Sequence, residues 1–106
     1  MAYDNNRLLL ELEKIRRDVN REVIHAEVPE LSLADIEPII RMVAKVRLAY
    51  LKEFLDIARL GDQLPSSHQV EMLKELRLAY DELVAAANAM ETAIQRGYVD
   101  VRGVGD

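Results

Sequence analysis

The strongest structural signal in the sequence is the stretch LKELRLAYDELVAAANAMETAIQRG, residues 73–97. Apolar or small residues recur there at steps of three and four: Leu73, Leu76, Tyr80, Leu83, Ala87, Met90, Ile94 and Gly97. Steps of three and four place side chains on one face of an α-helix, as in the seam of a coiled coil. The stretch therefore predicts a long helix that packs this seam against another helix.

A second helix is predicted over about residues 33–60, and it carries two apolar stripes. One stripe consists of Ile39, Val43, Val46, Tyr50 and Ile57. The other lies about 100° around the helix and consists of Ile40, Ala44, Leu51, Leu55 and Ala58. Each apolar stripe of a helix is expected to pack against a neighbour. Two stripes therefore predict two partners for this helix. The first and third helices could supply both within a self-sufficient bundle, and a dimer that closes a larger core is the competing interpretation.

A first helix is predicted over about residues 4–27, ending before Pro29, because the residue before a proline disfavours the helical conformation. One face of it carries Leu8, Leu12, Ile15, Val19, Val23 and Ala26. Ser32 with Asp35 forms one candidate capping box, and Ser66 with Gln69 forms another. Gly61 suits the left-handed position after a helix. Pro38 predicts a kink or a false start in the second helix.

Together these segments predict an all-α fold, an up-down-up bundle of three long helices (about 4–27, 33–60 and 66–97) with coiled-coil-like packing. A chain of 106 residues fits one domain, so residues 1–97 are expected to form a single helical bundle domain. Residues 98–106 form a C-terminal tail that is expected to be extended or disordered.

Composition narrows the classes of function. The chain is acidic, with a net charge of −5, and nucleic acid is not expected as a partner, because phosphate contact needs a basic surface. The sequence has no cysteine, no apolar run of membrane-spanning length and no signal peptide at its start. The expected location is the cytoplasm, without a membrane partner and without a cofactor.

Two identical tetrapeptides, Arg-Leu-Ala-Tyr, begin at Arg47 and Arg77. If the second and third helices form a hairpin, Arg47 lies level with Tyr80, and Tyr50 lies level with Arg77. Such pairs could form structural cation–π contacts. We expect Arg47 to be at least half buried and bonded to a carboxylate or a tyrosine of another helix. We also expect Tyr50, Leu51 and Phe54 to be largely buried.

Four carboxylates could hold a metal ion. Glu27 and Glu30, followed later by Glu53 and Asp56, resemble the paired acidic motif of MazG-like nucleotide pyrophosphohydrolases, although Pro29 interrupts the first pair. The resemblance covers only these four positions. It implies a Mg²⁺-dependent hydrolase, in which carboxylate oxygens hold the metal against a triphosphate.

A ridge on the first helix is a candidate interaction surface. It consists of Leu10, Lys14, Arg17, Arg21 and Ile24, and it lies opposite the apolar stripe. A basic ridge flanked by apolar residues can dock an acidic partner, although it can equally be a solvated face. The sequence favours a small helical protein–protein interaction module over an enzyme. An assembly factor, chaperone, inhibitor or complex subunit would act by homodimerisation or by docking on another protein. The pyrophosphohydrolase is the alternative.

Overall fold

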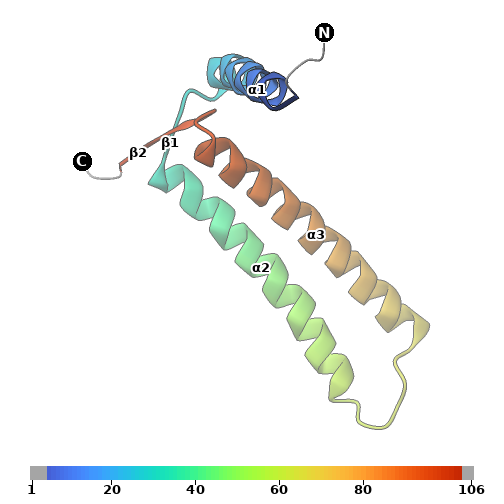
Figure 1. The fold of residues 1–106 in the computed structure, drawn as a ribbon. Helices are drawn as coiled ribbons and strands as arrows, with labels where there is room; N and C mark the ends of the chain where they lie inside the picture. The colour runs from blue at the N-terminus through green and yellow to red at the C-terminus, as the bar shows by residue number, and fades with distance from the viewer. Residues whose placement is uncertain (1–4, 104–106) are drawn as a thin grey trace. The chain divides into compact units, whose positions relative to one another are not determined.

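The structure is a computed structural model that describes residues 5–103. It contains the helices α1 (Asn5–Glu27), α2 (Leu33–Ala58) and α3 (Ser67–Gln95), together with the short strands β1 (Glu30–Ser32) and β2 (Asp100–Arg102) (Figure 1). The prediction of an all-α fold with three long helices is confirmed. Within residues 5–103, no helix is both long enough and apolar enough to span a membrane.

Reciprocal hydrogen bonds fix the start of α2. The backbone N–H and the hydroxyl of Ser32 donate to Asp35 Oδ2 at 2.9 and 3.0 Å, and the Asp35 N–H donates back to Ser32 Oγ at 3.2 Å. These bonds, the backbone one first, hold the pKa of Asp35 below its usual range. The predicted capping box is confirmed. The helix then runs through Pro38, so no false start occurs there.

A second capping box begins α3. Ser66 N–H donates to Gln69 Oε1 at 2.8 Å, and Gln69 N–H donates to Ser66 Oγ at 3.1 Å, which confirms the second capping box. Glycines follow the ends of both long helices in the left-handed region, with φ of 78° at Gly61 and 75° at Gly97. A backbone without a Cβ adopts this conformation at little cost, so both helices stop where the sequence supplies glycine.

Residues 36–89 form one compact unit, in which α2 packs against α3 as an antiparallel hairpin (Figure 1). The first predicted stripe of α2 is half-buried, and we call it the inner stripe: Ile39, Val43, Val46, Tyr50 and Ile57. Ile36, Ala49 and Glu53 are half-buried as well. The α3 seam is half-buried along its whole length. The predicted seam is therefore the packing face of α3, and the inner stripe is the packing face of α2.

Residues 5–35 and 90–103 belong to the other unit. Here β1 and β2 pair in parallel, with Glu30 opposite Asp100 and Ser32 opposite Arg102. The two residues just before β2, Tyr98 and Val99, are 7% and 2% exposed, and they are the buried residues of the described chain. Of the predicted tail, residues 104–106 lie outside the described residues.

The prediction that Leu51 and Phe54 are buried is wrong for the single chain. Phe54 is 56% exposed and Leu51 is 49% exposed, while Tyr50 is half-buried. The physical reason lies in the geometry of α2. Its apolar arc is wider than one neighbouring helix can cover, and α3 covers only the inner stripe.

Candidate interaction surfaces

Three side chains join α2 to α3 in the middle of the hairpin. Arg47 Nε donates to the hydroxyl of Tyr80 at 3.2 Å, and the guanidinium carbon lies 5.5 Å from the centre of the Tyr80 ring. The rings of Tyr50 and Tyr80 stack with centroids 6.1 Å apart and planes 27° apart. Arg47 itself is exposed. The charged head therefore bonds to tyrosine while it stays in contact with water.

Tyr50 and Arg77 line one open hollow on the hairpin, together with Val70, Leu73 and Lys74. Of the two predicted pairs, Arg47 contacts Tyr80, whereas Tyr50 stacks on Tyr80 and shares only the lining of this hollow with Arg77. The hollow is lined mainly by side-chain stems and a tyrosine ring. We assign Arg47, Tyr50 and Tyr80 to holding the hairpin in register.

The second predicted stripe of α2, namely Ile40, Ala44, Leu51, Leu55 and Ala58, is exposed. We define an outer stripe from the exposed residues of this face: Ile40, Ala44, Leu48, Leu51 and Leu55. It adds Leu48 to the predicted stripe and leaves out Ala58 at the helix end. These residues lie within about one quarter of the helix circumference. The outer stripe is therefore a continuous apolar surface, beside the face that packs on α3.

Helix α1 carries a second uncovered apolar surface, the α1 stripe. Its members are Leu8, Leu12, Ile15, Val19 and Val23, with exposed fractions from 45% to 63%. Single exposed leucines are ordinary on protein surfaces, whereas a contiguous row over several helical turns usually marks an interface. The α1 stripe and the outer stripe are thus the two strongest candidate binding surfaces.

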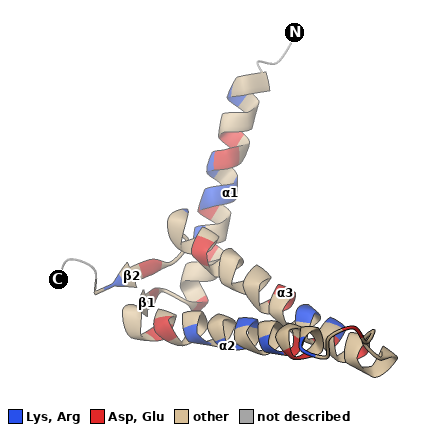
Figure 2. Ribbon diagram, turned by 90° about the horizontal axis from the view of Figure 1, so that it is seen from below, with Lys and Arg blue, Asp and Glu red and all other residues tan. Residues whose placement is uncertain are grey.

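The predicted basic ridge on α1 is divided in the structure. Leu10 is 71% exposed, Lys14 and Arg17 are exposed, and Ile24 is half-buried. Arg21 makes long-range hydrogen bonds to Gly97 and Asp100. Figure 2 shows acidic and basic positions interleaved along α1, which agrees with its local ion pairs between Arg7 and Glu11, at 3.8 Å, and between Arg16 and Glu13. Only part of the ridge is therefore free to meet a partner.

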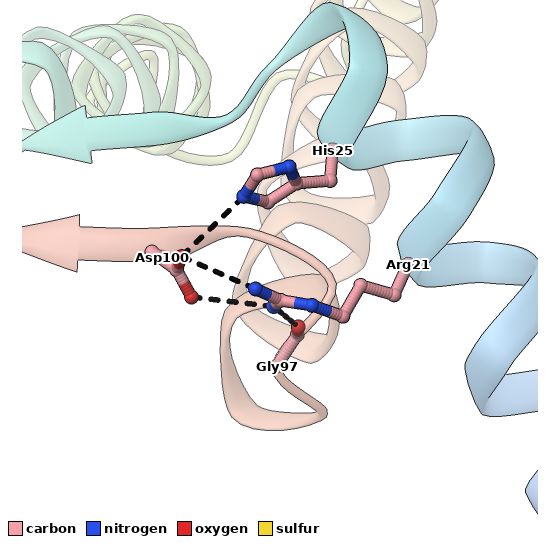
Figure 3. Close-up of polar contacts among 4 residues, drawn as sticks. All are labelled: Arg21, His25, Gly97 and Asp100. Carbon is pink, nitrogen blue, oxygen red and sulfur yellow. Dashed lines mark hydrogen bonds and ion pairs between the residues drawn. The ribbon is translucent and has the colours of Figure 1, made fainter.

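Arg21 belongs to a polar cluster that ties α1 to the C-terminal strand (Figure 3). Its guanidinium donates to both carboxylate oxygens of Asp100, at 3.3 and 3.4 Å, and to the carbonyl oxygen of Gly97. His25 Nε2 lies 3.5 Å from Asp100 Oδ2. The hydrogen bond from Arg21 is the main reason why the pKa of Asp100 lies below its usual range. The cluster fixes the position of β2 relative to the last turns of α1.

Sequence reasoning missed Asp100 and its link to His25. Its partners are separated from it by more than seventy positions along the chain, and no local spacing connects them. The one available signal was the alternation of apolar and polar residues at the start of the tail, which is compatible with a short strand. In the structure, the alternating segment forms β2 and pairs in parallel with β1.

The four candidate metal-binding carboxylates occupy unlike positions. Glu27 is the last residue of α1 and Glu30 opens β1, so the first pair does not share a helical face. Glu30 lies 3.8 Å from Arg102, and Asp56 lies 3.4 Å from Arg59, whereas Glu53 is half-buried on α2. Among residues 5–103, no three acidic or histidine side chains are grouped closely enough to hold a metal ion.

The fold and these surfaces were compared with known proteins. Neither the protein-family models, nor the curated proteins, nor the solved structures gave a match to this chain.

Proposed function

We propose that this protein is a small cytoplasmic helical interaction module that acts by dimerisation or by docking on another protein. One observation carries the proposal. The outer stripe and the α1 stripe are exposed in the single chain. Apolar stripes at helical spacing are normally buried against a neighbour.

The magnitude of this exposure supports a partner. Fully burying a large aliphatic side chain gains about 1.5–3 kcal/mol, so each half-exposed member of the two stripes forgoes about 1 kcal/mol. Nine large side chains together forgo on the order of 10 kcal/mol. This is a gross gain, from which association subtracts an estimated cost of about 4–15 kcal/mol in lost translational and rotational freedom.

Local ion pairs account for part of the polar surface of α2. Arg41 pairs with Glu37 at 2.6 Å, and Arg59 pairs with Asp56. Surface pairs of this kind occur in most soluble helices and contribute little to stability. The apolar stripes have no local pairing of this kind, and a partner is the usual reason for such a surface.

The test compares two substitutions of leucine by glutamate. Leu48 lies in the outer stripe, whereas Leu64, in the turn between α2 and α3, is 90% exposed and belongs to neither stripe. Sedimentation at micromolar concentration should show a dimer or larger species for the wild type and for Leu64→Glu, and a monomer for Leu48→Glu.

If the wild type sediments as a monomer, the docking form of the proposal is tested with the same pair of variants. Wild-type and Leu64→Glu baits should capture a common partner from the native host, and Leu48→Glu should lose it. A monomeric wild type whose captured proteins do not differ from those of Leu48→Glu would refute the proposal.

A further inference from the structure

The open hollow on the α2–α3 hairpin has a volume of about 260 Å³, and both helices line it. Tyr50 comes from α2, whereas Val70, Leu73, Lys74 and Arg77 come from α3. All five residues lie within one compact unit, residues 36–89. Sites for whole small molecules usually enclose about 300–1,000 Å³, so the hollow fits a single large side chain better than a cofactor.

The aromatic part of this lining is held in place by contacts inside the hairpin. The Tyr50 ring stacks on Tyr80 with centroids 6.1 Å apart, and Arg47 Nε donates to the Tyr80 hydroxyl at 3.2 Å. Val70, on the other helix, is 50% exposed, so apolar surface in the hollow stays open to solvent. A fixed ring beside open apolar surface suits an anchor side chain of a partner, because little ordering is needed when the anchor enters.

Two positive charges border the hollow without a partner. Lys74 and Arg77 are exposed, and their side chains form no ion pair or hydrogen bond within residues 5–103. Carboxylates stand one helical turn away from them, at Glu71 and Asp81, but do not pair with them. At the same kind of spacing on α2, Arg59 does form an ion pair. Lys74 and Arg77 are therefore available to carboxylates from another molecule.

We infer that the hollow is a docking site for an acidic segment of a partner protein, whose anchor side chain enters the hollow and whose flanking carboxylates meet Lys74 and Arg77. Charge complementarity selects this occupant. A purely apolar group would leave the two cations beside it without a partner, and a small free anion would leave the apolar lining uncovered. The inference goes beyond the proposed function, because the hollow contains no residue of the outer stripe or the α1 stripe.

The test uses the isotope-labelled full-length chain and the synthetic peptide Glu-Glu-Phe-Glu-Glu, which carries one aromatic anchor between carboxylates. Binding should shift the backbone amide signals of Tyr50 and of residues 70–77. The chain has a net charge of −5, so its surface as a whole repels this peptide, and shifts confined to the hollow identify a local site. Peptides with glutamine in place of glutamate, or alanine in place of phenylalanine, should each bind at least about fivefold more weakly.

A matched pair of double variants tests the two cations. Lys74→Gln with Arg77→Gln should weaken binding of the peptide about fivefold, the effect expected from losing two exposed ion pairs. Lys14→Gln with Arg17→Gln removes the same residue types at the same spacing from exposed positions of α1 and should leave binding unchanged. Circular dichroism confirms that both variants stay helical. Equal weakening in the two variants, no shifts in the hollow at millimolar peptide, or shifts centred on the outer stripe would each overturn the docking site.

Leu48→Glu separates failure of this inference from failure of the proposed function. Leu48 does not line the hollow, so this variant and Leu64→Glu should both retain the peptide site. A chain that dimerises or captures its partner through Leu48, but whose hollow does not bind the peptide, keeps the proposed function and overturns this inference. A chain that binds the peptide in the hollow, while Leu48→Glu sediments and captures proteins as the wild type does, keeps this inference and overturns the proposed function.

Discussion

Replacing Arg47 by alanine removes two contacts with Tyr80, the hydrogen bond at 3.2 Å and the guanidinium above the ring at 5.5 Å. An exposed cation–π contact contributes about 0.5–1 kcal/mol. A hydrogen bond contributes a net value of about 0.5–1.5 kcal/mol, and the low end applies here because Arg47 is exposed. Arg47→Ala should therefore lower the free energy of unfolding by about 1–2 kcal/mol.

Arg59→Ala is the matched control. Arg59 pairs with Asp56 at 3.4 Å within the same segment, and such a surface pair is worth about 0–1 kcal/mol. The difference between the two variants should be about 1 kcal/mol, or roughly 4 °C in melting temperature for a chain of this length. Urea unfolding followed by circular dichroism, at one fixed protein concentration, measures it.

A double-mutant cycle isolates the contact itself. Tyr80→Leu keeps an apolar side chain at the half-buried seam position but removes both the ring and the hydroxyl. In the Tyr80→Leu background, Arg47→Ala should cost about 1 kcal/mol less than it does in the wild type. Equal losses of stability for Arg47→Ala in the two backgrounds, or equal losses for Arg47→Ala and Arg59→Ala, would refute the assignment that the Arg47–Tyr80 contact stabilises the hairpin.

Three further predictions concern the ends of the elements. Arg21 lowers the pKa of Asp100 in the folded chain, so the free energy of unfolding should decrease as the pH falls from about 3.9 through the lower folded pKa. Asp100→Asn should make the free energy of unfolding, measured in urea, depend less on pH in this range. An unchanged profile would contradict the role of the pair. Ser66→Ala should cost about 1 kcal/mol in the same assay, and Ser67→Ala, inside the helix, should cost less. Gly97→Ala should cost roughly 1–2 kcal/mol from its positive φ alone, because no atom lies within 4 Å of the added carbon; a neutral effect in thermal melts would show that the turn can relax.

Local spacing was enough to locate the helices. The seam that ends at Gly97, the caps at Ser32 and Ser66, and the stop at Gly61 are each encoded within a few residues, and each appears in the structure. These signals are strong because they depend on backbone chemistry and on helical period, and both act locally.

Two features depend on parts of the chain that local spacing does not connect. The parallel pairing of β1 with β2 joins segments about seventy residues apart, and three-residue strands carry almost no periodic signal. Phe54 was predicted to be buried but is exposed. A wide apolar arc indicates that a helix face tends to be buried, but it does not identify the element that would cover that face. The candidate site shares this property: its residues are apolar helix positions, which sequence alone assigns to a core.

Self-association is tested most directly by the mass of the wild-type chain at sedimentation equilibrium over a range of micromolar concentrations. The α1 stripe and the outer stripe predict a dimer, with twice the chain mass of 12.1 kDa, and a melting temperature that rises with protein concentration. A mass equal to that of one chain at every concentration, with a constant melting temperature, would contradict the dimer.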